Sequence, residues 1–536
     1  MTSKRQILIA FSTILFFALA CSTASNLATT AEDDLVASYD IDQENTLFLT
    51  AGQPRTLDPA ITHSGAAGPV GGIFSGLVGL DTNLQVYPEI ASGWEVSQDG
   101  TVYTFFLRRD AVFHDGRPVT ADDVIFSWQR AAHPDTGSDT VVTYLGDIIG
   151  VDEVTAGQAE QISGLRAIDD HTLEVRIDAP KPYFLSKLTY PVAYVVDRHN
   201  VSQPDWEHAP NGTGPFLLQE WRDDEVLILA GNDRYYLPPP AVSHVVYHMG
   251  AGIPMAMYEK DQIDLVSIGG SNLERAQDPN NPLSSDLQMG TNMCISYVGF
   301  NNRLAPFDDL LVRQAFSYAV DGQKLIDGLY GGNVLPAVGP LPPGIPGYTG
   351  NINGPRFDPE KARALLAQAG YADPNTFPAV TFTTSGYGSV GPLVTALITM
   401  WQDNLGVTVE PLLLDPFNYL DELYAGNVGN IFNSGWCADY PDPENFLDVL
   451  FHSDSEQNLM GYRNAEIDSL LESARIEQDI KRRLDRYHDI EQQIVAESPA
   501  IFLNHSLSAV LVKPHVQNYV TTPMGVAQWH RVRLNP

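Results

Sequence analysis

The chain contains 536 residues, of which 44% are hydrophobic and 18% charged, a globular composition that excludes global disorder and collagen-like repeats. Its 31 Lys and Arg residues stand against 66 Asp and Glu residues, so the formal net charge is −35. A negative excess of this size repels phosphate backbones and anionic lipid surfaces, which argues against a nucleic-acid partner and against peripheral membrane binding. Because domains typically hold roughly 100–200 residues, the length predicts two to four lobes.

The first residues predict an export signal that lies outside the fold. Lys4 and Arg5 form a short basic region, and an apolar run follows at 7–20. Such a run is too short to cross a bilayer core of about 30 Å as a helix, but it suits the hydrophobic part of a signal peptide. The signal peptide is predicted over residues 1–20.

The apolar run ends in Ala18-Leu19-Ala20-Cys21, which resembles the lipobox of bacterial lipoproteins. The commonest lipobox has Leu where this chain has Ala18, and a plain secreted protein cleaved nearby is the alternative. With a lipobox, Cys21 is lipidated and the polar residues 21–45 form a flexible tether. The chain is then exported to the periplasm or cell surface and is attached to the membrane only through this anchor.

The cysteine count leaves two residues to explain. Three Cys residues are an odd number for an oxidising compartment, but the use of Cys21 as the anchor leaves Cys294 and Cys437. These two could form a disulfide or could remain separate buried thiols, and the count alone does not decide between them.

After the tether, strand-like and helix-like segments mix without internal repeats, which indicates an α/β fold. Helix starts are clearest at Thr120, ahead of two Asp residues, and at Asp358, an N-cap followed by Pro359. Pro- and Gly-rich breaks fall near 204–214 and 336–348. Strands are predicted at 101–107, 173–177, 225–229, 242–248, 294–300 and 380–384, and helices at 120–131, 308–320, 359–369, 392–405, 465–477 and 481–496.

A series of short motifs runs along the chain, and their order is more informative than any one of them. In this order they closely resemble the oligopeptide/dipeptide/nickel class of ABC-transporter solute-binding proteins (family 5), and the oligopeptide-binding type most of all. The resemblance extends from about residue 46 to the C-terminus. The motifs are TLDP (56–59), IFSGLV (73–78), WEVSQDG (94–100), FHDGRPVTADDV (113–124), GTGPF (212–216), GFN (299–301), VRQA (312–315) and GWCADYPDP (435–443).

The resemblance implies a three-lobed, hinged periplasmic-binding-protein fold, type II-like, with an extra inserted lobe. In this class the N-terminal motifs are structural, so His114 is expected in a turn with its hydrogen bonds satisfied rather than in a metal or catalytic site. The implied lobes are lobe I at 46–65, 205–293 and 507–536, the inserted lobe II at 66–204, and the ligand-binding lobe III at 294–506.

The resemblance also places the ligand site in the GWCADYPDP stretch. In oligopeptide-binding members the Asp of this stretch, here Asp439, pairs with the α-amino group of the peptide. Main-chain groups at Gly435 and Cys437 would extend the bound peptide like an added strand, with the backbone of Gln53 and Pro54 pairing from the opposite lobe. Without the resemblance, the same stretch is interpreted as a Pro-rich turn.

Further site features follow from the same resemblance. Trp436 and Tyr440 would form apolar walls, with water filling the remaining space. Related members carry Cys at the positions of Cys294 and Cys437, which implies a disulfide between them. Some members carry Arg two residues before the Gly-Trp step, where it can bind a peptide carboxylate, but this chain has Asn433, so the preferred peptide length stays open.

One motif suggests a different class of protein. Residues 386–391 read G-x-G-x-x-G after a predicted strand and before a predicted helix, and Glu410 follows at about the distance of a dinucleotide-binding acid. Against that interpretation, only one such unit is present in an exported chain, and Pro392 explains the glycines as an ordinary helix start. An exported dinucleotide-dependent enzyme is the remote alternative.

Other catalytic patterns are absent from the sequence, which contains no H-E-x-x-H, C-x-x-C or G-x-S-x-G. The sequence therefore predicts a monomeric binding protein without catalytic residues, cofactor or metal. It would capture oligopeptides and deliver them to ABC permease subunits in the membrane. Dipeptides, nickel chelates, opines and oligosaccharides are the alternative ligands.

Overall fold

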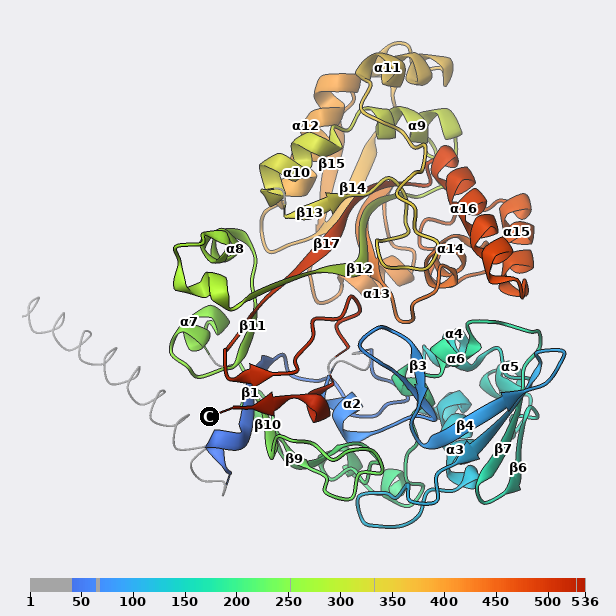
Figure 1. Cartoon of the computed structure of the whole chain (residues 1–536). Helices are drawn as coiled ribbons and strands as arrows, with labels where there is room; N and C mark the ends of the chain where they lie inside the picture. Colours follow the sequence, from blue (N-terminus) through green and yellow to red (C-terminus); the bar gives the residue numbers. More distant parts are fainter. Residues whose placement is uncertain (1–40, 64–67, 251, 332, 527, 536) are drawn as a thin grey trace, which may run out of the picture.

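The computed structural model shown in Figure 1 describes residues 41–63, 68–250, 252–331, 333–526 and 528–535. The predicted signal peptide, Cys21 and nearly all of the predicted tether lie outside these residues. Helices and strands form an upper and a lower body in this view, and long strands connect the two. The fold is therefore mixed α/β and lobed, as predicted, whereas the lobe bounds stay a prediction.

In the lower body, one four-stranded sheet joins segments far apart in the sequence. β1 pairs with β10 in parallel, with Thr46 opposite His244, and the remaining pairs are antiparallel. Side chains of the central strand β9 alternate between two core clusters, so both faces of that strand are covered. The strands, in spatial order, are β1 (Thr46–Ala51), β10 (His244–Met249), β9 (Val226–Gly231) and β8 (Phe216–Arg222), and α2 (Pro69–Ile73) packs beside them. The helices α7 (Pro254–Glu259) and α8 (Gly270–Gln277) instead pack with β11 (Leu265–Ser267), beside the strands that connect the two bodies.

The rest of the lower body is built on a second, antiparallel sheet. Its main helix α3 (Ala121–Ala132) begins as predicted at Thr120, which forms a capping box with Asp123. The fully buried Trp128 of this helix donates its indole N–H to the carbonyl of Ala193 at 2.9 Å. The sheet order is β4 (Ala91–Val96), β5 (Val102–Leu107), β7 (Thr172–Arg176) and β6 (Leu165–Asp169), with α4 (Val141–Leu145), α5 (Val151–Thr155), α6 (Phe184–Lys187) and the hairpin β2 (Val78–Leu80) and β3 (Val86–Pro88) beside it.

Two long strands, β12 (Leu287–Phe300) and β17 (Ala500–Val512), run from the lower body into the upper one (Figure 1). β12 begins seven residues before its predicted start. The prediction missed this first part because it lies outside the upper core and contains no apolar run. Two register shifts interrupt its pairing with β17, between Thr291 and Ile295 and between Ser296 and Tyr297. Such irregularities bend and twist a strand pair, here along the connection between the bodies.

The same sheet forms the centre of the upper body. Its strand order is β11 (Leu265–Ser267), β17, β12, β16 (Ile431–Cys437), β14 (Val380–Ser385) and β15 (Val409–Leu414), with β13 (Val334–Pro336) also pairing β17. The predicted helices of this region are observed within a few residues of their expected ends. They are α9 (Leu310–Tyr318), α11 (Pro359–Gln368), α12 (Pro392–Leu405), α15 (Ala465–Arg475) and α16 (Ile480–Glu497), and α10 (Gly322–Tyr330), α13 (Tyr419–Tyr424) and α14 (Glu444–Phe451) were not predicted.

The glycine-rich motif at 386–391 forms the turn between β14 and α12. β14, α12 and β15 make a parallel βαβ unit, so the local pattern was interpreted correctly as strand, turn and helix. Gly391 is the N-cap of α12 and Pro392 is its first residue, as an ordinary helix start requires.

The C-terminal segment returns to the lower body. There β18 (Val516–Gln517) and β19 (Arg533–Leu534) pair with each other. In the described part of the chain, no helix combines the length and the apolar character needed to cross a membrane.

Candidate functional site

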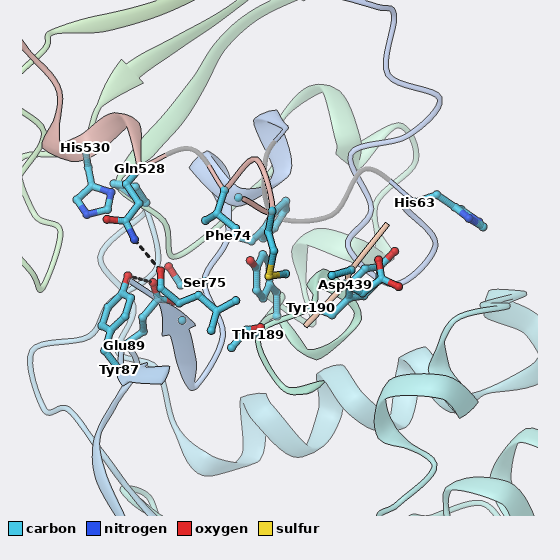
Figure 2. A pocket seen from close by; sticks show the side chains of 18 of the residues that line it. His63, Phe74, Ser75, Tyr87, Glu89, Thr189, Tyr190, Asp439, Gln528 and His530 are labelled. Carbon is cyan, nitrogen blue, oxygen red and sulfur yellow. Dashed lines mark hydrogen bonds between the residues drawn. The ribbon is translucent and has the colours of Figure 1, made fainter. Parts of the chain in front are cut away.

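A cavity of about 230 Å³ lies where the upper and lower bodies meet. Its walls come from the segments 71–89 and 189–194 of the lower body, the end of β16 at 437–439, and the C-terminal segment 524–530 (Figure 2). Gln528 fastens the C-terminal segment in place by donating from Nε2 to the carbonyl of Leu80 at 2.6 Å. The cavity is somewhat smaller than the roughly 300–1,000 Å³ of drug-sized ligand pockets, so it suits one end of a longer ligand.

The strand leading to this cavity has an edge available for pairing. β16 pairs along its whole length with β12, from Ile431 opposite Phe300 to Cys437 opposite Cys294. On its other side, β14 pairs only with Ile431 and Phe432. The stretch 433–437 therefore has no strand on that side among the described residues, and such an edge presents N–H and C=O groups to a partner chain.

Gly435 lies within this free edge and is exposed. A Cβ at this position would lie 3.0 Å from the carbonyl oxygen of Ile295 on β12, tighter than ordinary contact. Glycine therefore lets β16 lie close to β12. Asn433, two residues earlier, has its carbonyl bound by the hydroxyl of Tyr419 at 2.7 Å, so the edge available to a ligand begins after Asn433.

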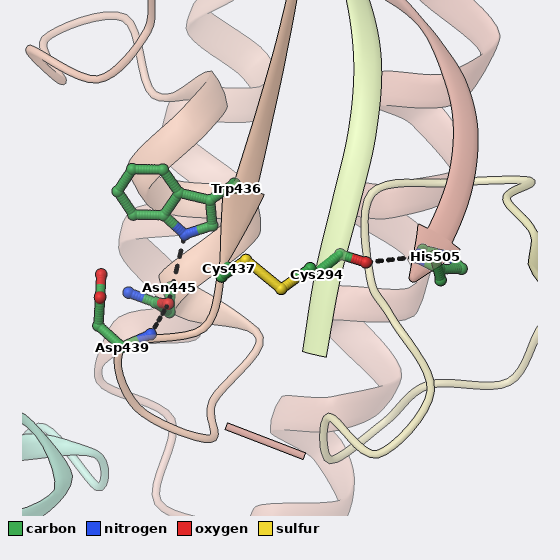
Figure 3. The surroundings of a disulfide bond; sticks show 6 residues. All are labelled: Cys294, Trp436, Cys437, Asp439, Asn445 and His505. Atoms are coloured by element: carbon green, nitrogen blue, oxygen red, sulfur yellow. Dashed lines mark hydrogen bonds between the residues drawn. A yellow bond between two sulfur atoms is a disulfide. The ribbon is translucent and has the colours of Figure 1, made fainter. Parts of the chain in front are cut away.

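Cys294 and Cys437 form a disulfide between β12 and the end of β16, with their Cα atoms 4.0 Å apart (Figure 3). The bond closes a loop with a sequence separation of 143 residues, and in the chain-entropy model such a loop stabilises the fold by about 5 kcal/mol. It fixes the end of β16 directly before Asp439.

Asn445 holds the loop that carries Asp439. Its Oδ1 accepts the backbone N–H of Asp439 at 2.9 Å and the indole N–H of Trp436 at 3.3 Å (Figure 3). Asn445 is completely buried in α14, so the position of the loop is tied to the core of the upper body. Sequence analysis missed this residue, because a single Asn in an apolar helix carries no recognisable signal.

The Asp439 carboxylate faces the cavity and has uncharged hydrogen-bond partners. Burial raises its pKa to about 6, although hydrogen bonds from Tyr144 and Asn445 act in the opposite direction. Tyr144 belongs to the lower body, and its ring stacks on that of Tyr190 with centroids 3.8 Å apart. No Lys or Arg of the described residues lies within 4.0 Å of the carboxylate. A buried acid of this kind favours a cation supplied by a ligand.

His63 lies at the same end of the cavity and attracts the Asp439 carboxylate. Its Nε2 lies 3.1 Å from Asp139. Neither residue belongs to a motif that sequence analysis selected, and the same is true of Tyr144 and Tyr190.

The sequence predicts that Tyr440 forms a wall of the ligand site, but the structure places its side chain elsewhere. It is completely buried, and its ring packs against Tyr144 and Tyr183 of the lower body. Its hydroxyl donates to the carboxylate of Glu444. The side chains of these two neighbouring residues point in different directions. Asp439 faces the cavity, while Tyr440 packs in the contact between the two bodies. Trp436 does not line the cavity either, and its indole N–H is directed to Asn445.

Gln53 and Pro54 are also absent from the wall of this cavity. They line a separate, open hollow together with Trp206 and Trp221. The side chain of Gln53 is held there by the turn between β8 and β9, donating to Asp223 at 2.7 Å and accepting the Asp224 N–H at 2.8 Å. Neither residue lines the cavity beside Asp439, and the pairing of their backbone with a ligand stays a prediction.

His114 has a structural setting, as expected. Its Nδ1 accepts the N–H of Gly212 at 3.2 Å, and its Nε2 donates to the carbonyl of Gly214 at 3.2 Å. Burial lowers its pKa to about 4. Across the described residues, no group of three or more His, Cys, Asp or Glu side chains could hold a metal ion.

A cavity between two connected bodies, with a carboxylate in its wall, is the arrangement expected of a solute-binding receptor of the periplasmic-binding-protein class. The sequence matches the profile "Bacterial extracellular solute-binding proteins, family 5 Middle" over residues 85–458. The chain therefore belongs to family 5 of the bacterial extracellular solute-binding proteins.

Known proteins support this assignment along nearly the whole chain. The periplasmic oligopeptide-binding protein OppA of Escherichia coli K12 is 30% identical over 524 residues, covering 94% of each chain. Heme-binding protein A of Haemophilus influenzae is 27% identical and is matched over 100% of both chains. The solved structure of the Escherichia coli murein tripeptide binding protein MppA superposes with a TM-score of 0.79 at 25% identity, covering 92% of this chain and 99% of that one.

These comparisons confirm the predicted family, the lobed fold class and the prediction that the chain is a binding protein and not an enzyme. The alternative of a dinucleotide-dependent enzyme is therefore set aside. Membership of an extracellular family also confirms that the chain is exported. Cys21 lies outside the described residues, and its lipidation stays a prediction.

Proposed function

We propose that this protein captures peptides by their amino end and delivers them to an ABC importer. The observation that carries the proposal is the Asp439 carboxylate, which faces a cavity between the two bodies and has only uncharged hydrogen-bond partners. The α-ammonium group of a peptide supplies the missing positive charge in a site that already excludes much of the water. The identity to OppA, described as oligopeptide-binding, supports the same ligand class.

The free edge of β16 supports an extended peptide rather than a compact solute. Beyond Asp439, Cys437 and Gly435 are exposed and lack a strand partner on one side among the described residues. A peptide held at its amino end by Asp439 would continue along this edge as an added strand, with backbone hydrogen bonds that do not depend on its sequence. This arrangement fits a receptor that accepts many peptides.

Contacts between the two bodies support closure around the ligand. Tyr144 of the lower body reaches Asp439, and Gln478 of the upper body donates to the carbonyl of Pro180 at 2.7 Å. In each contact the two residues belong to different bodies, which β12 and β17 connect, so a hinge in these strands would open and close the cavity. A ligand that touches both bodies stabilises the closed state by its differential affinity for that state.

The same proposal includes the partners and the location. The closed receptor would dock on permease subunits in the membrane as a monomer, with Cys21 lipidated and residues 21–45 as its tether. The three lobes would have the bounds given by the family resemblance. The negative net charge of −35 fits a role in which lipid attachment, rather than surface charge, holds the protein at the membrane.

Native mass spectrometry of the folded mature protein, followed by release and identification of the ligand, tests the class of solute. Heterogeneous mass additions that fragment as peptides are expected. A single non-peptide addition, such as an opine, an oligosaccharide, a nickel chelate or heme, would contradict the proposal.

Calorimetry with Asp439→Asn tests the role of the carboxylate. The variant should bind a free tripeptide with about 2–5 kcal/mol less affinity, more than tenfold, because the ammonium group loses its counter-charge. The matched control is Asp286→Asn, since Asp286 also accepts a Tyr hydroxyl, from Tyr258 at 2.8 Å, away from the cavity. Acetylation of the peptide amine should weaken binding to the wild type and leave Asp439→Asn nearly unchanged. Equal affinity of the wild type and Asp439→Asn would exclude the assignment.

A further inference from the structure

The cavity contains a second carboxylate, Glu89, which no sequence motif indicated. Figure 2 shows Glu89 and Tyr87 at one end of the cavity and Asp439 at the other, with Phe74, Thr189 and Tyr190 between them. Glu89 follows β3, directly after the hairpin, and is partly exposed to the cavity. The two acids therefore face the same enclosed space from opposite ends.

The surroundings of Glu89 are arranged to accommodate the carboxylate. The hydroxyl of Tyr87 donates to its Oε1 at 2.7 Å. Gly79 lines the same wall, and a Cβ at that position would lie 2.7 Å from Oε1, so the glycine leaves the space that the carboxylate occupies. Among the described residues, no Lys or Arg lies within the 4.0 Å of a salt bridge to Glu89, and none lines the cavity.

The remaining groups around Glu89 supply little positive charge. Burial raises the pKa of the Tyr87, Tyr194, Tyr235 and Tyr236 hydroxyls, so these side chains stay neutral. Burial lowers the pKa of His530 to about 4, so it is neutral near pH 7. Two arginines lie near Glu89. Arg531 attracts the carboxylate but is exposed, with its guanidinium 5.9 Å from the centre of the Tyr87 ring. Arg108 donates from Nε to the backbone carbonyl of Glu89 at 2.7 Å and forms no salt bridge with its carboxylate. Burial dominates, and it raises the pKa of Glu89 to about 7.

We propose that Glu89 is a specificity-determining residue that binds the side-chain cation of Lys or Arg at the first or second position of the peptide. This inference rests on the proposed function, because a peptide amine at Asp439 places the first side chains inside the cavity. The Glu89 carboxylate provides the counter-charge. The aromatic rings of Tyr87, Tyr235 and Phe74 provide faces for an ammonium or guanidinium group and for its aliphatic stem.

Peptide pairs that differ only in this charge test the inference. Calorimetry should compare Lys-Ala-Ala and Ala-Lys-Ala with Met-Ala-Ala and Ala-Met-Ala, since Met is similar in length and uncharged, and Ala-Ala-Ala serves as the reference. At pH 8 the wild type should prefer the Lys member of at least one pair by roughly tenfold, the scale of one buried charge pair. Towards pH 6 the preference should decrease, because Glu89 gains a proton there.

Glu89→Gln should remove the preference for Lys while retaining affinity for Ala-Ala-Ala within about threefold, since the amide keeps the shape of the acid. The matched control is Glu491→Gln, because Glu491 is likewise a buried carboxyl whose pKa burial raises to about 7, and it lies away from the cavity with the Leu341 N–H as its partner. Equal affinity of the wild type for the Lys and Met members of both pairs would overturn the inference. Absence of binding by all five peptides would instead contradict the proposed function.

Discussion

Two aspartates three residues apart in one loop have opposite surroundings. Asp442 is buried and accepts two hydrogen bonds from the guanidinium of Arg483, at 2.7 and 2.8 Å, whereas Asp439 has uncharged partners and faces a cavity. The first acid is fully neutralised inside the protein and can contribute only to structure. The second has no Lys or Arg within 4.0 Å among the described residues, and this is why we propose it as the group that binds a peptide amine. Burial alone would not distinguish them.

Arg483→Met should produce the largest effect, on stability. The guanidinium also donates to the Ala474 carbonyl and lies over the rings of Tyr183 and Tyr487, so its loss leaves Asp442 as a buried, uncompensated charge. The free energy of unfolding should fall by about 3–5 kcal/mol, measured by denaturant titration. The double variant Arg483→Met, Asp442→Asn should recover part of that loss. A change below about 0.5 kcal/mol would show that Asp442 is not held by this pair.

The pH dependence of binding should distinguish Asp439 from Asp442. Because the free site has a pKa of about 6 at Asp439 and the ligand requires the charged form, affinity for Ala-Ala-Ala should fall up to tenfold for each pH unit below about 6. It should also fall above about pH 8, where a peptide amine loses its proton. The affinity for acetylated peptide should show neither the fall below about pH 6 nor the fall above about pH 8. An affinity for Ala-Ala-Ala that is constant between pH 5 and 7 would refute the role of Asp439.

Ionisation of Asp439 should lower the stability of the ligand-free protein, whereas it strengthens ligand binding. Since the folded pKa of Asp439 is raised from 3.8 to about 6, its contribution to stability is complete below pH 3.8 and is lost as the pH rises through 6. Asp439→Asn should remove this loss, so the difference in unfolding free energy between variant and wild type should grow in favour of the variant from pH 4 to 6.5. A constant difference over that range would contradict the raised pKa.

Tyr144→Phe should produce the smallest effect, a shift in the pH dependence of binding, and it tests the assignment of Asp439 as the group that binds the peptide amine. The Tyr144 hydroxyl stabilises the charged form of Asp439, so removal of the hydroxyl should raise the pKa of Asp439. The pH below which affinity falls should then move upward by roughly one pH unit. Calorimetry at several pH values measures this shift. Tyr462→Phe is the matched control, because the Tyr462 hydroxyl donates to Glu497 at 2.9 Å away from the cavity. An identical shift in both variants would exclude a specific role for Tyr144.

Much of the fold could be predicted because its signals are local. The capping box at Thr120, the Pro392 start of α12 and the apolar strands at 380–384 and 173–177 lie within short windows of sequence. The early part of β12 could not be predicted, because its pairing with β17 depends on residues more than 200 positions away.

The sequence by itself determined the family and selected Asp439, because ordered motifs are a property of the chain alone. Only the tertiary structure decided what surrounds that residue. Tyr144 reaches it from the other body, Tyr440 turns away into the core, and Gln53 is held by a distant turn. The Glu89 carboxylate likewise lines the cavity only because the hairpin β2–β3 lies against it. Charge, burial and hydrogen bonding act through space, so residues without any motif can determine what a site binds.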